Sequence, residues 1–199
     1  MDTGLDSEQQ DALQELCNIA MGAAGESLAA FTEAFVELSI PHIRAIEPRE
    51  LTVSLTELGS SENISAMAQP FSFSEVECFA LVVLTENSIE ELCNQKVVET
   101  EQECDQLLLD FCYSITDVCL DRLAESMEVS LDKSLAFTVI KNIPVDQFVF
   151  NEILPWNKLW AIEINYHLEN HPFNCDLVLL IPETLHEPII SVLDRLLVQ

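Results

Sequence analysis

The sequence predicts an α+β fold in which two helix–strand–hairpin–helix units, related by a pseudo-twofold axis, share one antiparallel sheet, with the long helices carrying the functional site. The first observation is a repeat: a long amphipathic helix followed by β-type runs occurs twice, at an offset of about 95 residues. The second is that no linker rich in Pro, Gly or Ser separates the two copies. We therefore expect a single domain over residues 1–199, made of fused repeats over about 1–99 and 100–199.

The first repeat is expected to hold a long helix, a strand, a strand pair and a short helix. Ser7 stands three residues before Gln10, a capping-box spacing that predicts a helix start. The run ELTVSLTEL alternates apolar and polar residues, as a half-buried strand does, and the run from Phe79 to Leu84 is continuously apolar, as in a buried strand. In chain order these elements are expected over residues 7–38, 50–58, 63–86 and 87–98, the short helix being capped by Asn87 or Ser88.

The second repeat is expected to follow the same plan. A second long amphipathic helix comes first, then a β-type run (SLAFTVIKN), a strand pair and a closing helix. The stretch between Pro144 and Pro155 has no clear periodicity and is assigned to a connection. In chain order the elements are expected over residues 100–129, 134–142, 158–168, 175–182 and 183–197.

Charge and composition exclude several function classes. The chain of 199 residues carries a formal net charge of −27, with 8 Lys and Arg against 35 Asp and Glu. No basic patch can therefore follow a phosphate backbone or an anionic membrane surface, so we expect neither nucleic-acid binding nor association with such a membrane. Solubility, adaptation to a salty cytoplasm, and steering of a partner with a basic face each account for the acidity.

The chain is expected to be a cytoplasmic globular protein. Hydrophobic residues make up 49% of it, and none of its apolar runs reaches the ~18 residues of a membrane-spanning helix, so membrane insertion is not expected. Its first residues, MDTGLDSEQQ, lack the basic and apolar regions of a secretory signal. Its seven cysteines are odd in number, show no CxxC spacing and mostly stand at apolar positions. We therefore expect buried thiols in a reducing compartment rather than a disulfide framework.

The first long helix carries an unusual polar stripe. On a helical wheel its apolar residues fall on one side, whereas Asp11, Glu15, Asn18 and Gly22 line up on the other. Acidic residues near a helix N-terminus are ordinary solvated positions. An asparagine inside a helix, by contrast, costs helix propensity without an evident structural return. Asn18 is therefore the residue of this stripe that most favours a functional interpretation.

The second long helix provides an internal comparison. Shifted by about 95 residues, its stripe of Gln106, Asp110, Tyr113 and Asp117 overlays the first stripe. Asp110 keeps a carboxylate on a shorter side chain, a phenol replaces the amide, and Asp117 replaces the glycine. Asp110 and Tyr113 are therefore interpreted as a degenerate second site, and we expect one catalytic centre per chain.

The pattern Asp11-x3-Glu15-x2-Asn18-x22-Pro41 resembles the signature of the CheC/CheX/FliY family of chemotaxis phosphatases. The run ELCNIAMGAAGESLA is similar to that family's E-I-G-N-I-x-x-G helix opening, and the duplicated plan resembles CheC over essentially the whole chain. The resemblance implies a hydrolase of two-component signalling that removes phosphate from the phospho-aspartate of a CheY-type response regulator. Because the second copy lacks the asparagine, the chain resembles a relative with one intact active site.

The resemblance implies catalytic roles for Glu15 and Asn18. An amide both donates and accepts hydrogen bonds, so Asn18 can orient the attacking water, and Glu15 can pair with a cation on the regulator. Gly22 would let the helix approach the partner's backbone closely, and Asp11 would extend the charged contact or tune the helix start near the positive end of the helix dipole. No cofactor of its own is expected, and Mg²⁺ is expected on the partner response regulator, since the sequence shows no carboxylate cage.

Other interpretations remain open at the level of sequence. The alternative function is a non-catalytic receiver-binding or flagellar-switch-like interaction module, because the degenerate second helix and the acidity fit docking as well as turnover. The resemblance also raises a CheD-like deamidase as a further candidate partner. His167, His171 and Cys175 have a spacing compatible with metal ligation, but their strand–turn–strand context favours a polar hairpin tip, so no metal site is predicted.

Overall fold

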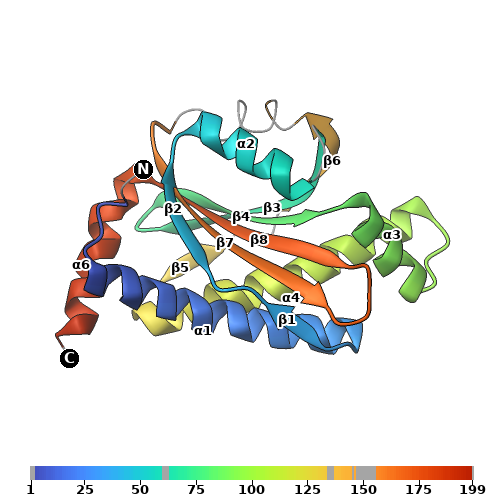
Figure 1. Cartoon of the computed structure of the whole chain (residues 1–199), viewed down its shortest axis with the longest axis horizontal. Helices are drawn as coiled ribbons and strands as arrows, with labels where there is room; N and C mark the ends of the chain where they lie inside the picture. The colour runs from blue at the N-terminus through green and yellow to red at the C-terminus, as the bar shows by residue number, and fades with distance from the viewer. Residues whose placement is uncertain (1–2, 60–62, 134–136, 145, 147–155, 199) are drawn as a thin grey trace.

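The structure of the chain is a computed structural model that describes residues 3–59, 63–133, 137–144, 146 and 156–198. Its elements, shown in Figure 1, follow one another in an order that occurs twice. In chain order they are α1 (Ser7–Thr32), β1 (Val36–Leu38), β2 (His42–Ile46), α2 (Pro48–Gly59), β3 (Asn63–Phe73), β4 (Val76–Leu84), α3 (Glu86–Gln95), α4 (Glu101–Met127), β5 (Leu131–Lys133), β6 (Thr138–Pro144), β7 (Leu159–Leu168), β8 (Asn174–Pro182), the 3-10 turn η2 (Glu183–Leu185) and α6 (His186–Leu197).

The described strands form one antiparallel sheet that interlocks the two halves of the chain. Its order is β1-β7-β8-β4-β3-β5, with β2 also pairing with β7 and β6 also pairing with β3. The central pair, β4 with β8, sets Val82 opposite Leu177. The short strands cross over: β1 and β2 pair with β7 of the second repeat, whereas β5 and β6 pair with β3 of the first. Each half therefore completes the edge of the other half's hairpin.

This arrangement confirms the predicted fold class, an α+β fold with two equivalent units on one antiparallel sheet. The β3–β4 pair is matched by β7–β8, and α1 and α3 are matched by α4 and α6. The long helices also share one burial pattern, because the same positions face the sheet in both. The buried residues Leu13, Cys17, Ala20, Ala24 and Leu28 of α1 correspond to Leu108, Cys112, Ile115, Cys119 and Leu123 of α4.

The sheet is buried on both faces, which gives the molecule two cores. Helices α1 and α4 pack side by side against one face and form the larger core with α6, whereas α2 covers the opposite face and forms the smaller one (Figure 1). Side chains of a strand alternate between the two cores, so in β4 Val82 lies in the larger core and Leu81 and Val83 lie in the smaller one. This two-sided burial explains the continuous apolar runs of β4 and β8.

The strand predicted over residues 50–58 is wrong, because this segment is helix α2. Leu51 and Leu55 are both fully buried in the smaller core, whereas Val53, between them, is exposed. Two apolar residues four positions apart fit one helical face, and their burial against the sheet selects the helix. The alternation of apolar and polar residues was compatible with either structure.

Several predicted boundaries also change. The first helix begins after Asp6, whose carboxylate accepts from the backbone N–H of Gln9, so the predicted Ser7–Gln10 capping box is displaced by one residue. The same helix ends at Thr32, and the rest of the predicted 7–38 helix forms the turn and β1. The cap of α3 is Thr85 rather than Asn87 or Ser88. The β-type run predicted over 134–142 begins as β6 only at Thr138, and its residues 134–136, like most of the connection between Pro144 and Pro155, lie outside the described residues.

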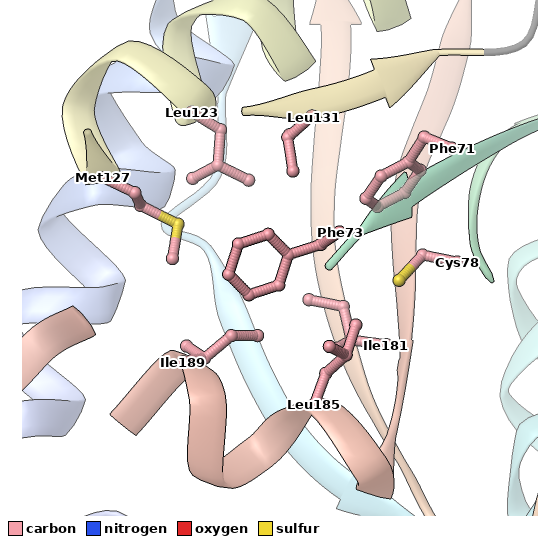
Figure 2. A pocket seen from close by; sticks show the side chains of 9 residues that line it. All are labelled: Phe71, Phe73, Cys78, Leu123, Met127, Leu131, Ile181, Leu185 and Ile189. Carbon is pink, nitrogen blue, oxygen red and sulfur yellow. The ribbon is translucent and has the colours of Figure 1, made fainter. Parts of the chain in front are cut away.

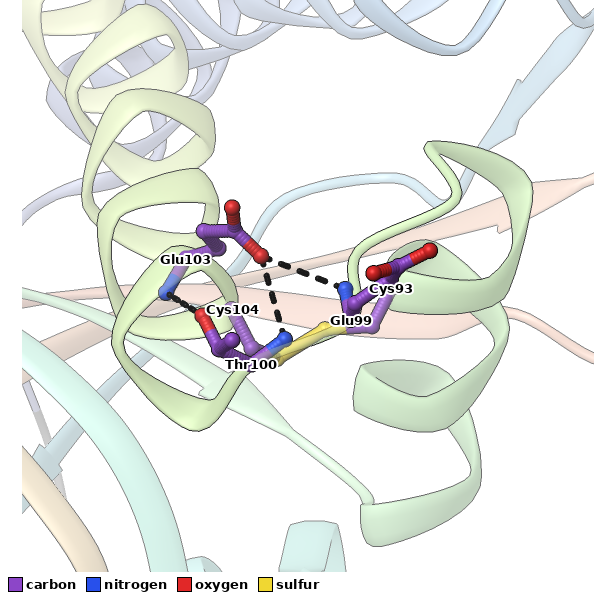
Figure 3. Close-up of a disulfide and its surroundings, with 5 residues drawn as sticks. All are labelled: Cys93, Glu99, Thr100, Glu103 and Cys104. Atoms are coloured by element: carbon purple, nitrogen blue, oxygen red, sulfur yellow. Dashed lines mark hydrogen bonds between the residues drawn. A yellow bond between two sulfur atoms is a disulfide. The ribbon is translucent and has the colours of Figure 1, made fainter.

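The prediction that all cysteines are thiols is wrong for two of the seven. Cys93 near the end of α3 and Cys104 in the first turn of α4 form a disulfide, with their Cα atoms 5.8 Å apart (Figure 3). The turn between them is closed by a capping box in which Thr100 and Glu103 satisfy each other's backbone N–H groups. The other five cysteines are free and buried, as predicted.

An apolar cavity of about 30 Å³ lies at the end of the larger core (Figure 2). Phe73 at the tip of β3 faces it, together with residues of α4, β5, η2 and α6. Its lining is entirely apolar, so it offers no polar partner to a water or a charged ligand. None of the helices that the structure describes is long and apolar enough to span a bilayer.

Candidate functional site on the first long helix

The structure places the predicted polar stripe on the open side of α1. Asp11, Glu15 and Asn18 are exposed and Gly22 is half-buried, whereas the opposite side of the helix is buried against the sheet and α4. The side chains of Glu15 and Asn18 stand one turn apart on one face, because residues three apart on a helix are neighbours. The spacing read from the sequence therefore yields a contiguous polar surface about two to three turns long.

Helix α1 is fixed in place from its buried side and along its N-terminal half. The hydroxyl of Tyr166 on β7 donates to the backbone carbonyl of Met21 at 3.1 Å, next to Gly22 at the C-terminal end of the stripe. The side-chain amide of Gln9 donates to Asp194 of α6 at 2.7 Å, and that of Gln14 donates to the carbonyl of Pro41 at 3.4 Å. These contacts hold the helix backbone, so the exposed stripe stands on a rigid support.

Glu15 and Asn18 themselves have no partner within the described part of the chain. Neither side chain makes a hydrogen bond or an ion pair there, although each carries groups that do so readily. Beneath them lies Cys17, whose thiol is fully buried, and burial raises its pKa to about 12. The Cys17 thiol therefore stays protonated and is not a nucleophile for this surface. The Glu15–Asn18 pair therefore presents one carboxylate and one amide to a partner.

The two glycines of α1 have different structural explanations. A Cβ atom built on Gly25 would come within 2.9 Å of Leu38 Cδ2 on β1, so close packing of the strand accounts for that glycine. A Cβ atom on Gly22 would meet nothing within 4 Å. A glycine in the interior of a helix costs about 1 kcal/mol relative to alanine. No packing contact of the described residues explains Gly22, so its interpretation is close approach by another molecule.

Asp11 is the fifth residue of α1, beyond the first helical turn, where Glu8 is the acidic residue. The helix dipole acts mainly within the first turn, so the predicted effect of Asp11 on the helix start is weak there. Its predicted contribution to a charged contact remains compatible with its exposure.

The stripe on α4 differs because its side chains are engaged within the fold. Asp110 accepts a hydrogen bond from Gln106 at 2.8 Å. The ring of Tyr113 packs edge-to-face on Phe137, with their centroids 6.0 Å apart. Asp117 forms an ion pair with Lys133 of β5 at 2.5 Å. The carboxylate of Asp117, which stands where the first stripe has Gly22, is therefore paired within the fold, by a Lys133 that also binds Asp121. Burial lowers the pKa of Lys133, but its hydrogen bonds to the two carboxylates outweigh burial and raise the pKa overall.

The residues with metal-like spacing do not converge. His171 lies in the β7–β8 turn and contacts Glu91 and Gln95 of α3, whereas Cys175 is buried in the larger core. Among the residues described, no group of three His, Cys, Asp or Glu side chains is placed to hold a metal ion.

Two polar clusters, one partly buried and one buried, were not predicted from the sequence. On β2, the Arg44 guanidinium binds Ser54 of α2 and Glu163 of β7. On β8, Asp176 is buried and accepts from the amide of Asn165 at 2.9 Å. Burial raises the pKa of Asp176 to about 6, with the hydrogen bond from Asn165 opposing this and the nearby Glu163 charge adding to it. The signals in the sequence were the charged residues Glu163 and Asp176 inside two β-type runs of the second repeat.

Comparison with solved structures shows which fold this is. FliY from Thermotoga maritima is similar over 96% of this chain and 98% of its own, with a TM-score of 0.71 and 13% identity. The FliM middle domain from Vibrio alginolyticus is similar over 91% and 99%, with a TM-score of 0.60 and 14% identity. The chemotaxis protein CheX from Desulfovibrio desulfuricans is similar over 85% and 99%, with a TM-score of 0.53 and 10% identity.

The chain has the CheC/CheX/FliY fold. No protein-family model matches the sequence, and no curated protein matches it either. The CheC/CheX/FliY fold therefore connects this chain to its structural relatives through backbone arrangement, and the identity of its functional residues rests on the stripe of α1.

Proposed function

We propose that this protein is a chemotaxis phosphatase that hydrolyses the phospho-aspartate of a CheY-type receiver domain, with Glu15 and Asn18 as its catalytic pair. The observation that carries the proposal is that these two side chains are exposed and adjacent, and have no partner among the described residues, on a helix that is otherwise fixed to the core. The CheC/CheX/FliY fold and the pattern in the sequence support it.

The proposed chemistry needs a water held in line with the scissile phosphorus–oxygen bond. Phosphoryl transfer relies mainly on positioning and on compensation of charge, so a single well-placed amide can contribute substantially. Asn18 accepts a hydrogen bond from the water through its carbonyl oxygen and donates one to the phosphoryl group through its amide nitrogen. Glu15, one turn away, pairs with a cationic side chain of the receiver and sets the register of docking.

The proposal includes one catalytic centre per chain and no metal or cofactor of the protein's own. The corresponding stripe of α4 has its carboxylates bound by Gln106 and Lys133, and the Tyr113 ring occupies the place of the amide. The Mg²⁺ implied by the resemblance would remain on the receiver, whose phosphorylated form is a cytoplasmic molecule, so the proposal also places this protein in the cytoplasm.

The alternative function is a non-catalytic interaction module of the flagellar-switch type. FliM middle domains are prominent among the structural relatives, and the FliG–FliM complex of H. pylori includes one with a TM-score of 0.64 and 12% identity to this chain. On this alternative, the exposed stripe of α1 would dock a receiver or a switch subunit without turnover.

Single-turnover dephosphorylation of a ³²P-labelled receiver distinguishes the two functions. We expect the protein to accelerate loss of phosphate, and the Asn18→Ala variant to lose about a hundredfold of that acceleration, the typical cost of one positioning group. Asn94→Ala is the matched control, since Asn94 is also an exposed asparagine in a helix, α3, away from the stripe. Binding of the phosphorylated receiver without acceleration would favour the alternative, and equal rates for Asn18→Ala and the parent would remove Asn18 from the site.

A further inference from the structure

A groove of about 370 Å³ lies between β2 and α2, on the side of the sheet opposite α1. Figure 1 shows α2 above the sheet and β2 descending beside it. The groove is lined by Ile43, Arg44, Ala45 and Ile46 of β2 and by Glu50, Val53, Ser54 and Glu57 of α2. It belongs neither to the stripe of Glu15 and Asn18 nor to the apolar cavity at the end of α4.

The groove follows the backbone edge of β2. Successive side chains of a strand point to opposite faces, so a groove lined by four consecutive residues must run along the edge rather than over one face. Strand β2 pairs with β7 on one side, and no other described strand pairs with it. Such an edge presents a row of N–H and C=O groups to which a further strand can hydrogen-bond.

The Arg44 side chain links the two walls of the groove. Its Nη2 atom donates to Ser54 Oγ of α2 at 2.9 Å and to Glu163 Oε1 of β7 at 2.5 Å. These hydrogen bonds fix the spacing of β2 and α2, so the groove beside the open edge is held in shape by the protein's own contacts.

The α2 wall of the groove defines the chemistry of what fits. Glu50 and Glu57 flank Val53, whose side chain is 59% exposed, and the one cation in the lining, Arg44, is already paired with Glu163. Along a helix, residues 50 and 57 stand about 10 Å apart, whereas residues i and i+4 of a strand stand about 13 Å apart. Long basic side chains can span that difference.

We propose that this groove binds an extended segment of a partner protein, which adds to β2 as a further strand and carries the pattern basic-x-apolar-x-basic. The apolar residue lies on Val53, and the two basic residues pair with Glu50 and Glu57. The main-chain hydrogen bonds to β2 supply affinity and the side chains of the α2 wall supply specificity, as is usual in strand addition. This second interaction surface is independent of the phosphatase proposal.

Fluorescence anisotropy with a labelled peptide, Thr-Lys-Thr-Val-Thr-Lys-Thr, tests the proposal on the whole chain. We expect saturable binding that is weakened about tenfold or more by Glu57→Lys, since attraction becomes repulsion. Glu90→Lys, the same charge change at an exposed position of α3, is expected to leave binding unchanged, as is Asn18→Ala. Equal loss with Glu57→Lys and Glu90→Lys would overturn the proposal, because it would mean that only the overall charge attracts the peptide.

Two N-methylated versions of the same peptide test strand addition itself. Alternate amides of a strand face the same neighbour, so methylating one alternate set is expected to abolish binding and methylating the other set to leave it intact. Equal affinities for both peptides would overturn the proposal. Absence of peptide binding, together with a dimer in sedimentation that Val53→Asp dissociates, would also overturn it and would assign the groove to a second copy of this chain.

Discussion

Replacing Gly22 by alanine should make the protein more stable and less active. Glycine in a helix interior is less favourable than alanine by about 1 kcal/mol, because alanine restricts the unfolded chain. A Cβ atom at position 22 meets nothing within 4 Å, so no steric cost offsets this gain. We therefore expect the free energy of unfolding to rise by about 1 kcal/mol in urea titrations, with an unchanged m-value.

Gly25→Ala is the matched control within the same helix. The gain in helix propensity is equal, but the new Cβ would lie 2.9 Å from Leu38 Cδ2 and 3.3 Å from Cδ1. Leu38 must move, and it can do so partly, because its side chain is 45% exposed. The stability gain should therefore be smaller than for Gly22→Ala or be lost altogether.

The activities of the same variants separate a functional glycine from an incidental one. The methyl group of Gly22→Ala stands between the helix backbone and a docked receiver, so we expect kcat/KM for receiver dephosphorylation to fall about tenfold or more. Turnover at the parent's rate, with stability raised as calculated, would refute close approach as the reason for Gly22. A loss of stability would instead show that this side of α1 is not open.

Three further predictions follow from the buried and engaged groups. Because the pKa of Asp176 is raised to about 6, the folded state keeps a proton that the unfolded state has released, so stability should fall by about 3 kcal/mol as pH rises from about 4 to 6. Asp176→Asn should flatten that profile in urea titrations at several pH values, and an unchanged slope would contradict the assignment. Reducing the α3–α4 disulfide with dithiothreitol should lower the free energy of unfolding by about 3 kcal/mol, the loop-closure value for a bridge of this span, and an unaltered urea midpoint would count against its formation. In an Asn18→Ala background, Tyr113→Asn with Asp117→Gly should recover weak dephosphorylation and Tyr113→Asn alone should not; strong activity with α4 untouched would show that the second face is functional.

The long helices were predictable because their signals are local. In α1 and α4, buried residues recur every three or four positions and a capping residue marks each start, so periodicity alone determines which face is buried. The repeat was predictable for the same reason, since the two halves of the sequence contain the same order of helical and β-type apolar patterns. Strands β7 and β8 were recognisable because burial on both faces gives long apolar runs.

The remaining elements depended on distant partners. Strands β1 and β2 are short and pair with β7, more than a hundred positions later in the chain. The sequence around them therefore shows no local pattern that predicts a strand. Leu51 and Leu55 fit a strand or a helix, and only their burial in the smaller core makes the segment α2. The cysteine pair likewise required α3 and α4 to bring two Cα atoms within 5.8 Å.

The duplicated architecture and the stripe that carries Glu15 and Asn18 could both be inferred from local patterns, because helical spacing alone aligns these two residues on one face. The difference in availability between the two stripes became visible only in the folded chain. Lys133 and Phe137 follow α4 in the chain and fold back onto Asp117 and Tyr113, whereas the described chain brings no partner to Glu15 or Asn18. Whether a polar side chain is satisfied depends on groups that meet it through space, and periodicity along the chain carries no information about them.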